Sequence, residues 1–181
     1  MRGWQFVAKI EYMSFAGLKY KTIQWLKDNR IEVSIFVLAF GLRFIYGLAV
    51  LMFFGEHGFV SHSDAFSFYL RGAENLINQH IFSLNTNAPF MLDAYRTPLY
   101  TSLVALFLWL GLPLYSLIFV QNVLAGVVAV LVYRIANLIF SDKRVVLWAA
   151  ILTSLEPLSL HWNNLIMSDF LFMFLFIWAA Y

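Results

Sequence analysis

The chain has 181 residues, of which 62% are hydrophobic, 19% are aromatic and only 12% are charged. Soluble domains carry about 25% charged residues, so this composition is typical of a membrane protein. The sequence contains no cysteine, which excludes disulfides, thiolate catalysis and cysteine-ligated zinc. The net charge of +2 is small, and the basic residues do not cluster on a soluble face, as they do in proteins that bind nucleic acid.

Basic residues are concentrated at the N-terminal end. Residues 1–30 contain six Lys or Arg against two acidic residues, whereas residues 55–97 contain two against four. The positive-inside rule therefore predicts a cytoplasmic N-terminus and an outer loop after the first apolar segment. Within the first region, residues 12–29 mix lysines with apolar side chains at helical spacing. They predict an amphipathic helix on the cytoplasmic membrane surface, with a loosely ordered tail as the alternative.

The first long apolar segment, residues 31–54, is long enough to cross a hydrocarbon core of about 30 Å. Lys27 and Arg30 precede it, so it is expected to run from the cytoplasm outward. Arg43 lies near its middle, where a charge is costly unless it is paired or faces a wet cavity. We expect no cleavable signal peptide, because this apolar run begins late and is too long.

A polar, amphipathic helix is predicted for residues 64–79, where apolar side chains recur at three- and four-residue intervals. A loop is expected to follow it, with Asn and Pro supplying the turns. The next helix, residues 98–111, reaches only about 20 Å, less than a full crossing. Three later segments are predicted spans: 114–140, 144–162 and 169–181. Pro157 should kink or end the helix in the second of them.

Whether residues 98–111 cross the bilayer decides the topology. If they cross, the basic residues Arg134, Lys143 and Arg144 lie outside, against the positive-inside rule. If they form a half-buried helix on the outer side, those residues lie inside, and Asp64 and Asp169 share the outer face. We favour the second arrangement. The predicted fold is all-α: a multi-pass transmembrane helical bundle with two juxtamembrane helices in its first outer loop.

Two parts are expected along the chain. Residues 1–30 form a cytoplasmic segment, and residues 31–181 form the N-terminal part of a transmembrane module. The sequence ends at Tyr181 within an apolar stretch that no charged residue follows. We therefore expect it to be the N-terminal part of a longer protein or a truncated product.

Two carboxylates are the candidate catalytic residues. Asp64 begins the polar helix, so it can be a helix N-cap worth about 1 kcal/mol, a general base in a partly buried cleft, or both. Asp169 follows Ser168 at the start of an apolar helix. It can be another cap, or a second carboxylate that binds a metal ion or a substrate hydroxyl.

Two arginines are candidates for phosphate recognition. Arg96 stands just before Pro98, and its planar guanidinium suits a phosphate, although it could instead be an interfacial side chain that reaches toward water. Arg71 lies on the polar face of its helix and can pair with Asp64, Glu74 or a phosphate, or remain solvated. The histidines do not have the spacing of a metal-binding motif.

The ordered set of these pieces resembles the N-terminal half of the GT-C glycosyltransferases. The resemblance is to the protein-mannosyltransferase and aminoarabinose-transferase-like superfamily of bacteria, and it covers about residues 31–181. Four stretches after Asp64 carry it: "RGAENLINQHIFSLN", "AYRTPLYTSLVALFLWLG", "LVYRIANLIFSDKR" and "LEPLSLHWNNLIMSDFLFMFLF".

This resemblance implies an enzyme of the cell envelope, embedded in the bacterial inner or plasma membrane. Such an enzyme takes a sugar from a polyprenyl-phosphate carrier and transfers it to an acceptor glycan, lipid or protein at the outer face. It implies that Asp64 is the essential acid of the first outer loop, that Arg96 contacts the carrier phosphate, and that Asp169 is the later acid. Further candidate substrate- or phosphate-binding residues are Arg71, Tyr69 and Tyr95. The need for a divalent metal, with Asp64 and Asp169 as candidate ligands, is left open.

The chain departs from the family pattern in three ways. Phe68 stands where the family often has tyrosine, with Tyr69 next, and Thr97–Pro98 replaces the usual Pro–Pro pair. The later spans and C-terminal outer domain of the family are missing, so this chain alone could be inactive. The alternatives are a non-catalytic multi-pass protein, such as a transporter or accessory subunit, and a degenerate relative that binds the carrier lipid without turnover.

Overall fold

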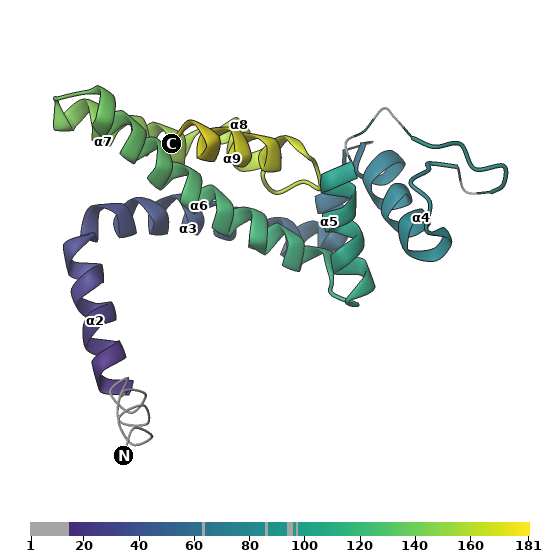
Figure 1. Cartoon of the computed structure of the whole chain (residues 1–181), viewed down its shortest axis with the longest axis horizontal. Helices are drawn as coiled ribbons and strands as arrows, with labels where there is room; N and C mark the ends of the chain where they lie inside the picture. Colours follow the sequence, from purple (N-terminus) through teal and green to yellow (C-terminus); the bar gives the residue numbers. More distant parts are fainter. Residues whose placement is uncertain (1–14, 63, 86, 94–95, 97) are drawn as a thin grey trace, which may run out of the picture. The chain divides into compact units, whose positions relative to one another are not determined.

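The computed structural model describes residues 15–62, 64–85, 87–93, 96 and 98–181, and its regular elements are all helices (Figure 1). This confirms the predicted all-α class. Over the described residues, β-type pairing is limited to an isolated bridge between Ser83 and Leu92. The chain divides into two compact units, Met1–Ser34 and Ile35–Tyr181.

The described part of the first unit contains α2 (Phe15–Asp28), so a helix stands where a loosely ordered tail was the alternative. Asn29 follows it, and both its backbone N–H (3.0 Å) and its side-chain Nδ2 (2.9 Å) donate to the carbonyl of Trp25 in the last turn. Trp25 and Tyr20 are exposed, although they are large and apolar. Exposed aromatic side chains beside lysines are typical of helices that lie on a membrane surface.

Two helical segments in the described part of the chain are long and apolar enough to cross a membrane. The first, Arg30–Val60, combines α3 (Arg30–Phe54) with the 3₁₀ helix η1 (Gly55–Val60) and has a mean hydropathy of 2.2. The second is α6 (Leu114–Ile139), with a mean hydropathy of 2.1. At about 1.5 Å per residue, both α3 and α6 exceed the hydrocarbon thickness of about 30 Å.

The helix predicted at 144–162 is broken where Pro157 was expected to interrupt it. α7 (Lys143–Leu155) ends before Glu156, and α8 (Pro157–Trp162) begins with the proline. Proline has no N–H to donate, and the Glu156 carboxylate accepts from the backbone N–H groups of Leu158 and Ser159, capping the new helix. A loop, residues 163–168, then leads to α9 (Asp169–Ala180); residues 163–167 are buried and Ser168 is half-buried.

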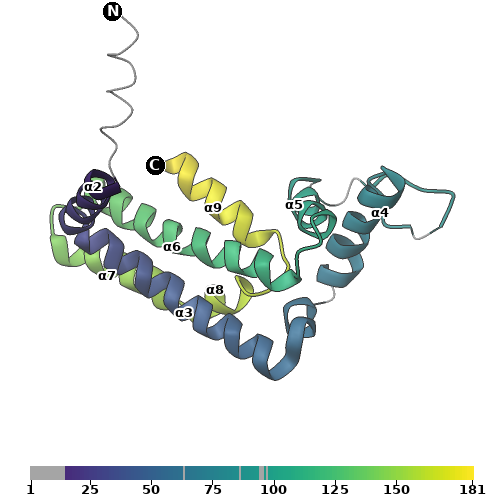
Figure 2. The same ribbon diagram turned by 90° about the horizontal axis from the view of Figure 1, so that it is seen from below.

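Helix α6 is the centre of the second unit. Figures 1 and 2 both show it alongside α7, α9 and the part of α3 that belongs to this unit. α6 meets α3 through an aromatic side chain: a Cβ on Gly126 would lie 2.6 Å from ring atoms of Phe36. Glycine at this position of α6 therefore leaves room for the Phe36 ring of α3.

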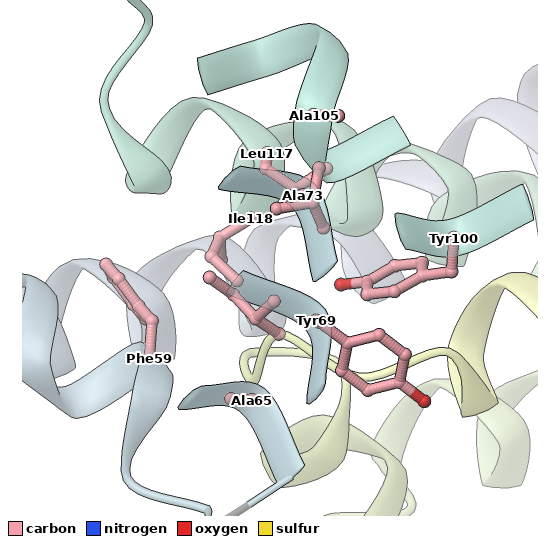
Figure 3. Packing of buried hydrophobic residues seen from close by; sticks show 10 residues of the cluster. Phe59, Ala65, Tyr69, Ala73, Tyr100, Ala105, Leu117 and Ile118 are labelled. Atoms are coloured by element: carbon pink, nitrogen blue, oxygen red, sulfur yellow. The ribbon is translucent and has the colours of Figure 1, made fainter. Parts of the chain in front are cut away.

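A second packed region lies at one end of α6. It combines η1, the π-helix η2 (Ala65–Leu70), α4 (Arg71–Gln79) and α5 (Pro98–Trp109) around buried residues that include Phe59, Tyr69 and Tyr100 (Figure 3). Figures 1 and 2 show α5 transverse to α6, whereas α7 and α9 run along it. π-Helical turns often occur at functional sites, and here the turn carries Tyr69.

Candidate functional site

The two strongest sequence candidates form an ion pair. Arg96 Nη2 donates to Asp64 Oδ2 at 2.5 Å, although the residues are 32 positions apart. Their side chains are 24% and 23% exposed, so the pair is partly shielded yet reachable from outside the protein. Asp64 holds the N-cap position of η2 but makes no side-chain capping bond. The capping alternative is therefore wrong for its carboxylate, which is directed to Arg96 instead.

Aromatic rings hold the Arg96 guanidinium. Its Cζ lies 4.4 Å from the ring centroid of Phe68 and 5.7 Å from that of Tyr69. Cation–π contacts at such distances contribute about 0.5–2 kcal/mol and restrict the arginine side chain. Phe68 thus supplies the nearer ring.

Tyr69 connects this pair to the beginning of α9. The ring is buried, and its hydroxyl is 2.7 Å from Ser168 Oγ. Figure 3 shows the hydroxyl turned toward the yellow segment that leads into α9. The Tyr69 ring also packs edge-to-face on Tyr100, with centroids 4.9 Å apart. Asp169 is therefore joined to the Asp64–Arg96 pair through Tyr69 and Ser168.

Hydrogen bonds from buried polar groups hold the loop before α9 in place. Tyr100 donates its hydroxyl proton to Gln121 Oε1 at 2.6 Å, and Gln121 Nε2 donates to the carbonyls of Asn163 (2.7 Å) and Leu165 (3.0 Å). The N–H of Ile166 donates to the Phe59 carbonyl at 3.0 Å. These bonds satisfy backbone groups that would be costly to bury alone, and they position Ser168 and Asp169.

Asp169 is exposed and is the first residue of α9. The partial positive charge of a helix N-terminus favours a carboxylate there. Burial raises the pKa of Tyr100 well above its ordinary value, and the negative charge of Asp169 is close enough to add to this effect. Tyr100 therefore remains a neutral hydrogen-bond donor beneath the site.

The remaining candidates lie elsewhere. Arg71 is exposed, with its Cζ 5.3 Å from the Phe66 ring centroid. It lines a shallow hollow together with Leu84, Asn85, Asn87, Ala88, Pro89 and Met91. The structure therefore places it against Phe66 and that hollow. Tyr95 lies outside the described residues.

The residues needed to hold a metal do not gather in the described part of the chain. It contains no group of three or more His, Cys, Asp or Glu side chains close enough to bind one ion. Asp64 is engaged by Arg96, and Asp169 alone is a poor site for a divalent ion that takes six or more oxygen ligands. The sequence left the need for a metal open and offered Asp64 and Asp169 only as candidate ligands, and the chemistry argued below does not use a metal.

Sequence reasoning missed a buried polar network around Arg43. Arg43 is 3% exposed, and its guanidinium donates to the carbonyls of Ser154 (3.0 Å) and Thr153 (3.2 Å) and to Ser159 Oγ (2.8 Å). These carbonyls lie at the end of α7, where Pro157 removes helical donors. The charge near the middle of residues 31–54 was the visible signal, but its partners are about 110 positions away.

Comparison with known proteins found no matching family model, no matching curated protein and no matching solved structure.

Proposed function

We propose that this protein is a membrane glycosyltransferase, or the N-terminal part of one, that transfers a sugar from a polyprenyl-phosphate carrier to an acceptor at the outer membrane face. The observation that carries the proposal is the 2.5 Å pair between Asp64 and Arg96. A carboxylate can accept the proton of an acceptor hydroxyl, and a guanidinium can bind a phosphate. Transfer from a lipid phosphate needs both groups at one place.

In the proposed topology, α3, α6 and the α7–α8 pair cross the membrane, and α9 begins a fourth crossing. α5 has 12 residues, about 18 Å, and is transverse to α6, which supports a position along the surface. The N-terminus and the basic residues near the α6–α7 turn are then cytoplasmic. Asp64 and Asp169 then face the outside together.

The ion pair suggests how the reaction would begin. An incoming carrier phosphate competes with Asp64 for Arg96, because both are anions that suit the same guanidinium. Release of Asp64 leaves a carboxylate beside the bound donor. The carboxylate takes the proton from the acceptor hydroxyl, the acceptor oxygen bonds to the anomeric carbon, and the bond to the phosphate oxygen breaks. The polyprenyl phosphate leaves with that electron pair, held by Arg96, and the anomeric configuration inverts.

Tyr69 has a positioning role in this proposal. Its hydroxyl is engaged by Ser168 and its ring lies beside Arg96. It therefore sets the distance between the phosphate-binding arginine and Asp169, which is proposed to orient the acceptor.

The test is transfer of a labelled sugar from its polyprenyl phosphate by the natural protein, expressed from its complete gene and held in lipid nanodiscs. Asp64→Asn should lower the rate at least about 100-fold, because general-base catalysis contributes about 10²–10⁴. Arg96→Gln should mainly raise the KM for the carrier. Glu74→Gln is the matched control, since Glu74 is an exposed carboxylate on α4, and it should leave the rate unchanged.

Three results would separate the alternatives. Unchanged transfer by Asp64→Asn would contradict the role of Asp64 as the base. Binding of the polyprenyl phosphate without transfer of any sugar tested would indicate a degenerate relative. Neither binding nor transfer by the natural protein would favour a transporter or accessory subunit.

A further inference from the structure

Three buried asparagine side chains form a relay with a defined direction. Asn164 Nδ2 donates to the Leu160 carbonyl at 2.9 Å, Asn122 Nδ2 donates to Asn164 Oδ1 at 3.3 Å, and Asn163 Nδ2 donates to Asn122 Oδ1 at 2.5 Å. A carbonyl can only accept, so Leu160 fixes the orientation of Asn164 and thereby of the other two amides. The last group in the relay is then Asn163 Oδ1, an acceptor.

This last acceptor is left unsatisfied. Asn163 is 1% exposed, and its Oδ1 has no hydrogen-bond partner among the described residues. An unpaired buried acceptor costs about 1–3 kcal/mol, so each such group calls for an explanation. Asn163 also lines a cavity of about 340 Å³ between residues 156–163 and the start of α9.

The other polar groups of this cavity are mainly acceptors as well. The carboxylates of Glu156 and Asp169 line it, and none of its lining residues is Lys, Arg or His. Arg43 reaches Ser159 at the wall, but its guanidinium also serves the α7 carbonyls. Two acidic residues therefore stand against one arginine at the wall, and among the described residues no donor reaches Asn163 Oδ1.

The rest of the lining favours an organic ligand over a metal ion. Trp162 presents an aromatic ring, and Met167, Met173, Leu158 and Phe170 supply apolar surface. Aromatic rings attract organic cations, and cavities of about 300–1,000 Å³ hold small molecules. A hard divalent ion would instead need several more oxygen ligands.

We propose that this cavity binds the protonated amine of a small organic ligand, with its apolar part against the methionines. The ammonium group donates to Asn163 Oδ1 and to the two carboxylates and lies against Trp162. The inference does not depend on glycosyl transfer, because it concerns binding in the absence of any sugar donor. The amine could be carried by a lipid headgroup or by a soluble molecule, and the experiment distinguishes these two sources.

The experiment titrates the whole protein with butylamine, which is protonated at pH 7, and with butanol as the neutral molecule of matched size. The protein is held in nanodiscs of phosphatidylglycerol, and the readout is the NMR signal of the Trp162 indole N–H, assigned by its loss in Trp162→Phe. Butylamine should shift this signal in a saturable manner, and butanol should not. Glu156→Gln and Asp169→Asn should each weaken butylamine binding about tenfold or more, because hydrogen bonds to charged groups are the strong ones.

Glu74→Gln again serves as the matched control and should bind butylamine as the unaltered protein does. Replacing half of the lipid with phosphatidylethanolamine identifies the source. Weaker butylamine binding then indicates a lipid headgroup, and unchanged binding indicates a soluble amine. Equal shifts with butanol, full affinity in both carboxylate variants, or a saturable response to Mg²⁺ or Ca²⁺ but not to butylamine would each overturn the proposal. If the natural protein binds butylamine but transfers no sugar, that result would count against the transferase proposal and not against the amine site.

Discussion

Arg43 caps the broken end of α7: its Nη1 donates to the Ser154 carbonyl at 3.0 Å, across 111 positions of sequence. An arginine in an apolar helix thus serves the carbonyls that lose their helical donors where Pro157 interrupts the chain. The buried charge of Arg43 in α3 is therefore explained by the helix break at Pro157, because the break exposes the carbonyls that Arg43 binds.

Replacing Arg43 should destabilise the protein more than replacing a surface cation. Arg43→Met keeps much of the side-chain volume but leaves the Thr153 and Ser154 carbonyls without their donor. We expect a loss of about 2–4 kcal/mol in the free energy of unfolding, since each buried unsatisfied group costs about 1–3 kcal/mol. Thermal unfolding in detergent micelles measures it. Lys21→Met, at an exposed site on α2, is the control, and an equal effect of both variants would contradict the capping role.

A pair of glycines on α3 tests the asparagine relay. A Cβ on Gly47 would overlap Asn164 Oδ1, whereas a Cβ on Gly41 would meet nothing within 4 Å. Gly47→Ala should push Asn164 away from Asn122 and lower the free energy of unfolding by about 1–3 kcal/mol. Gly41→Ala should raise it by up to about 1 kcal/mol, because alanine favours the helix. Chemical denaturation of both variants checks the difference in sign, and a stabilising Gly47→Ala would show that Asn164 has room to move.

The pKa of Tyr100 predicts a dependence of stability on alkaline pH. Burial raises this pKa in the folded protein, with a smaller contribution from the Tyr69 hydroxyl, while in the unfolded chain it is about 10. A raised folded pKa contributes stability that is complete below pH 10 and is lost as the pH rises above it. The loss from this one group is about 1.4 kcal/mol per pH unit.

Tyr100→Phe removes the ionisable hydroxyl and with it this pH dependence of stability. Its free energy of unfolding should be lower at pH 8 by about 1–2 kcal/mol, because Gln121 loses its donor, but should fall less steeply between pH 10 and 11. Denaturant titrations at several pH values measure both slopes. Tyr115→Phe, at an exposed position, should keep the slope of the unaltered protein. Parallel slopes for Tyr100→Phe and the unaltered protein would argue against the raised pKa.

Local patterns predicted the helices well, because each depends on near neighbours. Periodicity predicted a helix at 64–79, which the structure forms as η2 and α4. Hydropathy located α3 and α6, and Pro157 marked the break between α7 and α8. The partners of the polar residues could not be predicted in this way. Arg96 was expected to meet a phosphate, and its contact with Asp64 depends on how the loop before α5 returns to η2.

The asparagine relay was hidden for a related reason. Asn122 stands out as an amide within the apolar α6, which signals a buried polar contact. Its partners, Asn163 and Asn164, lie in the short stretch between the segments predicted at 144–162 and 169–181, about 41 positions away. The relay follows only once that loop is folded back against α6.

The proposed position of α5 on the outer surface can be tested by labelling, because the chain contains no cysteine of its own. Asn87 precedes α5 and Ser141 follows α6, and both are exposed. If α5 does not cross, Asn87→Cys should react with a membrane-impermeant maleimide in intact cells, and Ser141→Cys should react only after the membrane is opened. If α5 crosses, both cysteines face the outside and both react in intact cells. That result would place Asp64 and Asp169 on opposite sides of the membrane. The proposed outer site, which contains the ion pair between Asp64 before η2 and Arg96 before α5, would then lack its second carboxylate.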